Sequence, residues 1–191
     1  MRVSSAEDVA YVQRSYLSLD AVAAAESLAR AELADLVSAH VVPGPAYLLP
    51  SGEPMFPRDL CALLRSAGTP ADVQGHFRNR FVAVARHYGP LSPDRVDEEW
   101  ESYLSGAYGV CLRQVTPETI FLKEWLASAI EADLRAPDPE SPAWRRKLCE
   151  QVEGLDALLR PFAACDRVRF GRPTSRERCI DVPRARYPWL L

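Results

Sequence analysis

The chain has 191 residues, of which 48% are hydrophobic, and a net charge of −3. This length and composition suffice for one large domain or two small ones with a real core. No stretch approaches the roughly 18 consecutive apolar residues of a membrane-spanning helix. The first eight residues, M-R-V-S-S-A-E-D, lack the apolar core of a signal peptide. We therefore expect a cytoplasmic protein that does not enter a membrane.

The motifs of several well-known chemistries are absent from the sequence. Five cysteines are spread along the chain without a CxxC or CxxH pair, so no zinc site is expected from local spacing. No glycine-rich phosphate loop, HExxH pair or GxSxG elbow is present either. We expect neither a metal nor another cofactor.

Residues 1–68 predict short helices over 6–16, 19–26, 30–40 and 57–66, with a tight hairpin over 47–56 that turns at Gly52. Over residues 16–66 this order resembles the winged helix-turn-helix head of MerR-type regulators. The charges argue against DNA binding, because Arg30 is followed by the acidic Glu32 and Asp35, and the hairpin that would form the wing carries Glu53. We expect a head that serves packing or protein contact, with a transcriptional regulator as an alternative.

Residues 69–191 predict a helical bundle. A hydroxyl residue followed by proline, which is typical of a helix start, occurs at Thr69-Pro70, Ser92-Pro93, Thr116-Pro117 and Ser141-Pro142. Apolar residues then recur every three or four positions. The predicted fold is mainly α: a winged-helix-like unit (1–68) with a small β-hairpin, packed on a bundle with a basic C-terminal segment (69–191). The two parts could also form one compact domain.

The segment 100–120 mixes glycines and aromatic residues with one arginine, and we expect it to be a buried connection between helices that lines a pocket. Tyr108 and Cys111 are the candidate catalytic residues. Cys111 would need a base to lower its pKa, and His76 or His87, roughly on the same face of one predicted helix, could approach it; the alternative is a structural thiol. His76 is also a candidate for substrate binding. Arg113 is a candidate for binding an anionic substrate, unless Glu118 or Glu99 neutralises it.

The second candidate region, residues 160–186, is rich in arginine. Arg167, Arg169 and Arg176 are candidate ligands for an anion, beside a helix start that Thr174 or Ser175 would cap. The anion could belong to a small substrate or to an acidic carrier protein, and RNA is a weaker option. Alternatively, the arginines form a solvated basic face. The acidic run over 97–101 is expected to face solvent.

Nearly the whole chain resembles a family of domain-of-unknown-function proteins labelled natural-product biosynthesis proteins, from bacteria with GC-rich genomes. The stretches that carry the resemblance are P-G-P-A-Y-L-L-P-S-G and M-F-P-R-D (within 43–59), S-G-A-Y-G-V-C-L-R-Q-V-T-P-E-T-I (105–120), L-D-A-L-L-R-P-F (155–162), D-R-V-R-F-G-R-P-T-S-R-E-R (166–178) and A-R-Y-P (185–188). The resemblance implies a role in secondary metabolism and brings no reaction with it.

These observations favour an enzyme of natural-product biosynthesis that acts on a small carboxylate- or phosphate-bearing intermediate. Tyr108, Cys111 and Arg113 would line its pocket, and the arginines of the basic segment would hold the anionic group. The alternatives are a non-catalytic protein that docks an acidic carrier protein, and the MerR-like regulator. The sequence predicts neither the reaction nor the oligomeric state.

Overall fold

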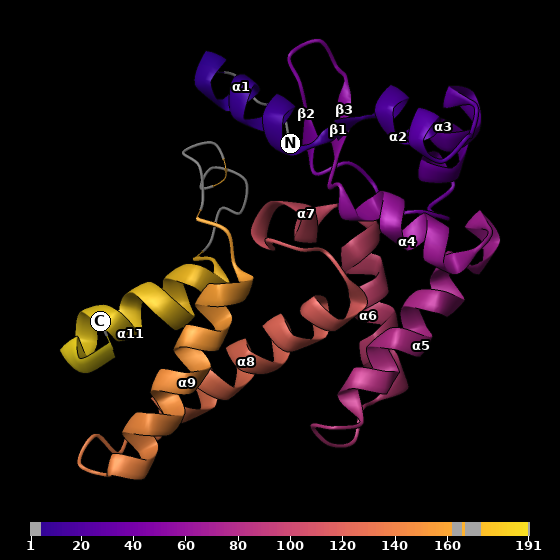
Figure 1. The fold of residues 1–191 in the computed structure, drawn as a ribbon. Helices are drawn as coiled ribbons and strands as arrows, with labels where there is room; N and C mark the ends of the chain where they lie inside the picture. The colour runs from indigo at the N-terminus through magenta and orange to yellow at the C-terminus, as the bar shows by residue number, and fades with distance from the viewer. Residues whose placement is uncertain (1–4, 162–165, 167–172, 191) are drawn as a thin grey trace.

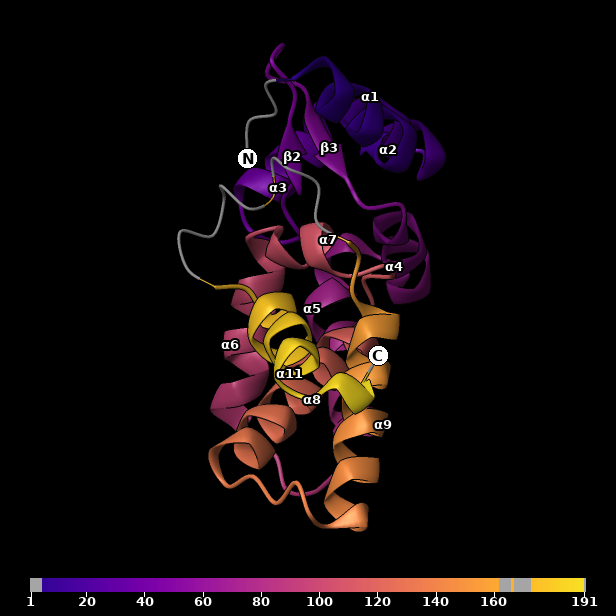
Figure 2. The same ribbon diagram turned by 90° about the vertical axis from the view of Figure 1, so that its left-hand side faces the viewer.

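A computed structural model describes residues 5–161, 166 and 173–190. The described chain is mainly helical and carries one small antiparallel sheet, as the sequence predicts. The molecule is elongated: the sheet and the first helices lie at one end, and the connection over residues 136–141 lies at the other (Figures 1 and 2).

The first 68 residues, called here the N-terminal unit, alternate helices and short strands. In chain order the elements are α1 (Ala6–Ser15), β1 (Leu17–Ser18), α2 (Leu19–Ala25), α3 (Arg30–Ser38), β2 (Tyr47–Leu48), β3 (Pro54–Phe56) and α4 (Asp59–Ala67). The sheet order is β1-β3-β2, and Met55 of β3 pairs with Ser18 on one side and Tyr47 on the other. The hairpin turns through Gly52 at a φ of 86°, which confirms the predicted turn.

The following residues form the bundle, in which three long helices begin at predicted prolines and a short 3-10 helix begins at the fourth, Pro70. Its elements are η1 (Pro70–Asp72), α5 (Val73–Ala85), α6 (Pro93–Leu104), α7 (Ala107–Cys111), α8 (Pro117–Arg135) and α9 (Pro142–Leu158). Thr116 and Ser141 cap their helices as expected. Ser92 makes no such bond, and the Thr69 hydroxyl donates to the Asp72 carboxylate instead, at 2.6 Å.

A C-terminal turn closes the described chain: η2 (Glu177–Asp181), α11 (Val182–Arg186) and η3 (Pro188–Leu190). It lies beside α8 and α9, and η2 contacts both (Figure 2). A wide π-type turn at η2 precedes Pro183, which has no N–H to donate to the Cys179 carbonyl four residues earlier.

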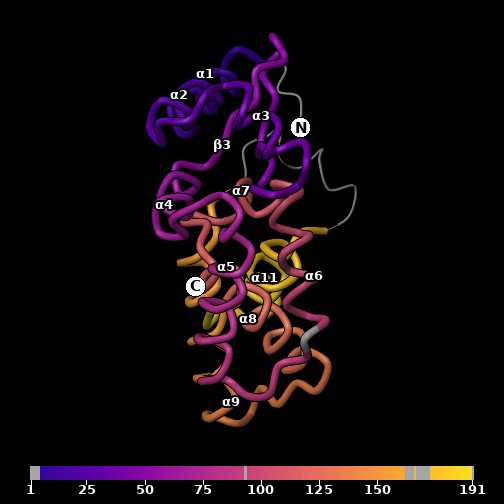
Figure 3. The backbone as a smooth tube through the Cα atoms, turned by 90° about the vertical axis from the view of Figure 1, so that its right-hand side faces the viewer, coloured from indigo at the N-terminus to yellow at the C-terminus, as the bar shows by residue number. Residues whose placement is uncertain are grey.

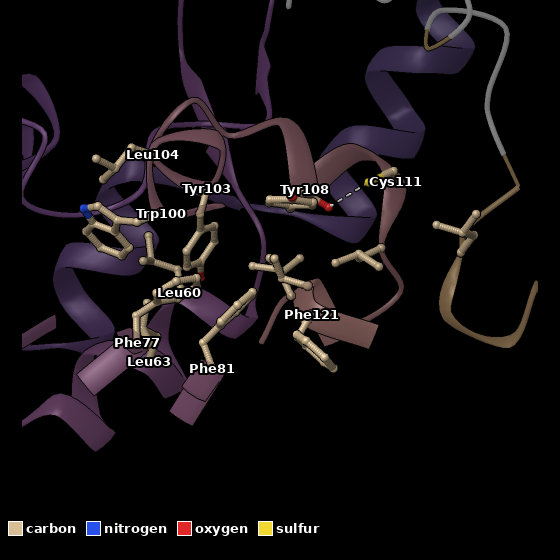
Figure 4. Packing of buried hydrophobic residues seen from close by; sticks show 14 of the residues in the cluster. Leu60, Leu63, Phe77, Phe81, Trp100, Tyr103, Leu104, Tyr108, Cys111 and Phe121 are labelled. Carbon is tan, nitrogen blue, oxygen red and sulfur yellow. Dashed lines mark hydrogen bonds between the residues drawn. The ribbon is translucent and has the colours of Figure 1, made fainter. Parts of the chain in front are cut away.

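One hydrophobic core joins the N-terminal unit to the bundle. It runs from Leu60 and Leu63 of α4 to Phe77 of α5 and Trp100 and Tyr103 of α6 (Figure 4). The ring centroids of Phe77 lie 5.2 Å from Trp100 and 5.6 Å from Tyr103. Apolar side chains of both parts are therefore buried against each other.

The segment 100–120 is only partly the connection that the sequence predicts. Its first five residues, from Trp100 to Leu104, are the last turns of α6, and α7 follows after Gly106. Gly44 donates its N–H to the Leu104 carbonyl at 2.9 Å. A Cβ on Gly109 would lie 2.6 Å from Cγ of Pro57. The glycines of this segment thus serve close contact with the N-terminal unit.

Candidate functional site

The bundle contains a pocket of about 190 Å³ between α5, α6 and α8. This pocket, called here the bundle pocket, is lined by Phe81, Ala85, Tyr88, Gly89, Pro90, Leu91, Arg95, Phe121, Glu124, Trp125 and Ser128. The connection between α5 and α6, which supplies part of this lining, lies at the end of the molecule remote from the sheet (Figures 1 and 3). Every lining residue comes from the bundle.

Aromatic rings form the walls of the bundle pocket. The ring centroid of Phe121 is 5.4 Å from Phe81 and 5.3 Å from Tyr88, and Tyr88 lies 4.7 Å from Trp125. Phe81 and Phe121 are buried, whereas Tyr88 and Trp125 are 43% and 37% exposed. The two exposed rings therefore lie at the mouth, and a ligand that covers them removes apolar surface from water.

Arg95 and Glu124 supply the charged groups of the pocket. Arg95 lies on the first turns of α6, and its Nη2 is 2.6 Å from Oε1 of Glu99 and 3.8 Å from Oε2 of Glu124. Glu124 lies on α8, beside Trp125 of the same wall. One guanidinium and one carboxylate thus face the same small space.

Behind Glu124 lies a buried polar cluster of Glu99, Tyr108 and Lys123, each less than 10% exposed. The Tyr108 hydroxyl donates to Oε2 of Glu99 and lies 3.3 Å from Oε1 of Glu124. The Lys123 ammonium donates to the same Glu124 oxygen and lies 5.1 Å from the centroid of the Tyr108 ring. Glu124 therefore connects the pocket to this cluster.

The buried cluster has shifted proton affinities. Burial raises the pKa of Glu99, because water no longer stabilises the carboxylate and Glu124 adds a nearby negative charge. Burial also raises the pKa of Tyr108, and the carboxylates of Glu124 and Glu99 raise it further. Burial alone would lower the pKa of Lys123, but Cys111, Glu124 and Glu99 outweigh it and raise it. Tyr108 thus holds its proton, and Glu99 takes one up more readily than an exposed glutamate.

The structure brings the two predicted catalytic residues, Tyr108 and Cys111, to this cluster. Both lie on α7 and are buried, and Sγ of Cys111 is 3.7 Å from the backbone carbonyl of Tyr108 (Figure 4). The cation that interacts electrostatically with the Cys111 thiol is the Lys123 ammonium, whose pKa Cys111 helps to raise. The sequence analysis expected a histidine near this thiol.

His76 and Arg113 lie elsewhere. Nε2 of His76 is 2.9 Å from the hydroxyl of Ser66, which places His76 against α4. Arg113 is exposed, whereas the sequence predicted it inside a buried junction. Its backbone N–H donates to the Leu158 carbonyl, so this strand-like segment pairs with the end of α9 and turns the side chain outward. Binding of a ligand by either residue stays a prediction.

The two glutamates considered as partners of Arg113 bind other arginines. Glu118 accepts two hydrogen bonds from Arg80, at 2.7 and 2.8 Å, and Glu99 pairs with Arg95. Neither carboxylate is paired with Arg113 in the structure.

The predicted anion site at residues 174–178 is filled from within the chain. The backbone N–H and hydroxyl of Thr174 donate to the Glu177 carboxylate, at 2.7 and 3.0 Å. Arg176 pairs with Asp156 and also donates to the Arg160 carbonyl at 3.3 Å. Arg167 and Arg169 lie outside the described residues.

Sequence reasoning missed Arg95, Glu99, Lys123 and Glu124. It placed Glu99 in a solvated acidic run, which is wrong, since Glu99 is 4% exposed. A signal was present: Glu99 lies three residues after Val96, and Lys123 lies three after Ile120, both within buried apolar stripes. A charged residue at such a position needs a partner, and here each pairs with a residue of its own helix: Glu99 with Arg95 and Lys123 with Glu124.

The comparisons with known proteins give a family and no activity. A model described as a family of unknown function (DUF6058) matches residues 69–188, which is more than half of the chain and includes the whole pocket lining. The chain therefore belongs to this family. No curated protein and no solved structure matches it.

Two further features are absent from the described residues. None of their helices is long and apolar enough to cross a membrane. Within 5–161, 166 and 173–190, no three or more histidine, cysteine, aspartate or glutamate side chains are grouped so that they could hold a metal ion.

Proposed function

We propose that this member of the DUF6058 family is an enzyme that binds a small molecule in the bundle pocket and exchanges a proton with it through Glu124. The molecule has an apolar body of about one ring and a polar end group. The reaction is a step of natural-product biosynthesis, in line with the sequence resemblance described above.

The observation that carries this proposal is the position of Glu124. Its carboxylate lines the pocket. On the buried side, the same carboxylate accepts a hydrogen bond from the Lys123 ammonium and lies close to the Tyr108 hydroxyl. A carboxylate that only stabilised the fold would not need an aromatic pocket in front of it. Clefts that join apolar walls to a few convergent polar groups are typical of active sites. The groups with shifted pKa values here, Glu99, Tyr108 and Lys123, lie directly behind Glu124.

The arrangement supports acid–base chemistry. A ligand proton taken up by Glu124 can pass on to the Tyr108 oxygen while Tyr108 gives its own hydroxyl proton to Glu99, because that hydroxyl lies between the two carboxylates. Burial raises the pKa of Glu99, which favours its uptake of a proton. Lys123 remains charged and holds Glu124 in place, so its role is positioning.

The predicted arginine set does not form this site. Arg113 is exposed and Arg176 is paired with Asp156, so neither lines the bundle pocket. The guanidinium in the pocket is that of Arg95, which the neighbouring glutamates already engage. A small substrate remains the proposal, and its charge is argued separately below.

The experiment is complementation of a deletion strain with metabolite profiling. An intermediate should accumulate when the gene is deleted and disappear when the wild-type gene is restored. Glu124→Gln should leave the intermediate in place, because glutamine keeps the shape but cannot exchange the proton. Trp125→Ala should also fail, because it removes a wall of the pocket without touching the cluster.

Glu101→Gln is the matched control, an exposed glutamate of α6 outside the pocket lining, and it should complement fully. Circular dichroism and thermal melts would confirm that all variants are folded. Full complementation by a folded Glu124→Gln protein would contradict the proposal.

The second candidate is a regulator, which the topology of the N-terminal unit favours. The order helix, strand, two helices and two strands, with β1 beside β3, is similar to that of a winged helix. The charges oppose DNA binding: Arg30 at the start of α3 is 3.0 Å from Asp20 and 3.6 Å from Glu53 of the wing. A mobility shift with the promoter of its own gene cluster tests it, and we expect none.

A further inference from the structure

We infer that the bundle pocket selects a ligand whose polar end is a protonated amine. The inference rests on the proposed function, since it names the substrate class of the same pocket. It differs from the sequence-based expectation of an anionic substrate.

The charge balance at the polar end leaves no surplus positive charge for an anion. Arg95 lies within 4 Å of three carboxylates, at 3.9 Å from Glu98, 2.6 Å from Glu99 and 3.8 Å from Glu124. The other cation of the site, Lys123, donates to Glu124. With all groups ionised the set carries one net negative charge, and with Glu99 protonated it is neutral. A ligand carboxylate would have to share Arg95 with carboxylates that are already there.

The two oxygens of Glu124 have different surroundings. Oε1 receives the Lys123 ammonium and lies near the Tyr108 hydroxyl. Oε2 lies 3.8 Å from Nη2 of Arg95, which is longer than a hydrogen bond. Within the described part of the chain, Oε2 accepts no hydrogen bond. A ligand N–H donor placed beside it would form a charge-assisted one.

The aromatic walls favour the same end group. The faces of tyrosine, tryptophan and phenylalanine rings attract cations, and proteins recognise ammonium groups with several such rings around one site. Tyr88, Phe121 and Trp125 form a continuous set of rings next to Glu124, with neighbouring centroids 4.7 and 5.3 Å apart. An ammonium group over the face of such a ring is stabilised, whereas a carboxylate there is repelled by the same negative face.

The size of the pocket limits the rest of the molecule. A volume of about 190 Å³ is below that of typical sites for drug-sized ligands, which start at roughly 300 Å³. Together with the aromatic walls, this fits a single ring joined to the amine by a short chain. The inferred class is therefore a small aryl-alkyl amine.

Three probes of one shape and different charge test the inference: phenethylamine, 2-phenylethanol and phenylacetate. Each is titrated to millimolar concentration into the full-length protein, and the NMR signal of the Trp125 indole N–H is followed, assigned with Trp125→Phe. We expect phenethylamine to bind about tenfold more tightly than 2-phenylethanol, and phenylacetate to bind most weakly.

Two variants separate the carboxylate from the rings. Glu124→Gln should reduce the affinity for phenethylamine to about that for 2-phenylethanol, and the affinity for 2-phenylethanol should change little. Glu101→Gln, exposed and outside the pocket, should bind all three probes as the wild type does. Unchanged amine preference in folded Glu124→Gln would overturn the assigned role of Glu124.

The remaining outcomes distinguish this inference from the proposed function. Tightest binding of phenylacetate, or equal binding of all three, would overturn the amine assignment and leave the pocket as a small-molecule site. No change of the Trp125 signal with any probe, in a folded protein, would contradict both.

Discussion

A Cβ atom on Gly106 would lie 2.4 Å from the carbonyl oxygen of Pro45, closer than any side chain can approach backbone. Gly106 also has a φ of 74°, in the left-handed region that favours glycine. Gly106→Ala should therefore lower the free energy of unfolding by at least about 3 kcal/mol, as strain and overlap add.

Gly52→Ala is the matched control for this prediction. Gly52 also has a positive φ, but nothing lies within 4 Å of its Cβ position. Gly52→Ala should lower the free energy of unfolding only by the backbone strain, about 1 to 2 kcal/mol. Urea unfolding measures both, and equal losses would show that the contact with Pro45 has no weight.

The two lysines of the chain should respond very differently to substitution. Lys123 is buried against Tyr108 and Glu124. Lys123→Met removes the ammonium that neutralises the partly buried Glu124 carboxylate, and should lower the free energy of unfolding by about 2 to 4 kcal/mol. Lys147 is 58% exposed at its pair with Asp133, and Lys147→Met should cost less than about 1 kcal/mol. Chemical denaturation compares the two, and similar costs would contradict the burial of the Lys123 pair.

Glu99 should make the stability of the protein depend on pH. Its pKa is raised in the folded state by burial, so the folded protein favours the protonated form. The associated stabilisation is present below the ordinary glutamate pKa of about 4.3 and is lost as the pH rises through the folded value. Glu99→Gln cannot ionise, and its stability relative to the wild type should increase as the pH rises from about 4 and then level off.

Unfolding of the two proteins across this pH range measures the Glu99 effect. The exposed Glu101→Gln variant should show no such trend relative to the wild type. A stability difference between Glu99→Gln and wild type that stays constant with pH would refute the buried state of Glu99.

Arg176 should act on stability and leave the pocket unaffected. Arg176→Ala removes an ion pair with Asp156 and a hydrogen bond to the Arg160 carbonyl, and should cost about 1 to 3 kcal/mol. Burial by itself would raise the pKa of Asp156, but hydrogen bonds from Arg184 and Arg176 outweigh it and lower it. The stabilisation by ionised Asp156 is present above the ordinary aspartate pKa and is lost as the pH falls through the lowered pKa of Asp156 in the folded protein. The loss of stability caused by Arg176→Ala should therefore shrink below about pH 4.

Phenethylamine binding checks the second half of the Arg176 prediction. The affinity should match that of the wild type, because Arg176 is not part of the pocket lining. A loss of binding without a loss of stability would restore Arg176 to the ligand site that the sequence suggested.

Features set by neighbouring residues were predictable from the sequence. The bundle helices beginning at Pro93, Pro117 and Pro142 and the hairpin turn at Gly52 depend on local backbone preferences, which a sequence displays. The recurrence of apolar residues every three or four positions likewise predicted that these segments are helices.

Features set by distant residues were not predictable. Gly106 stood out in the sequence, but the atom that excludes a side chain there belongs to Pro45, some sixty residues earlier. Glu124 and Arg95 meet only because α6 and α8 both pack against α5, and neither is marked by its own neighbours. Arg113 was expected to be buried because its neighbours are apolar, and a short backbone bridge to Leu158 turns it outward instead.

The shared core has a consequence for the family match, which begins at residue 69. Phe77, Trp100 and Tyr103 of the matched part are buried together with Leu60 and Leu63, which precede it. Expressed from residue 69 onward, the protein would present these aromatic rings to water and tend to aggregate. A relative with an unrelated beginning must therefore shield the same rings with some other apolar segment.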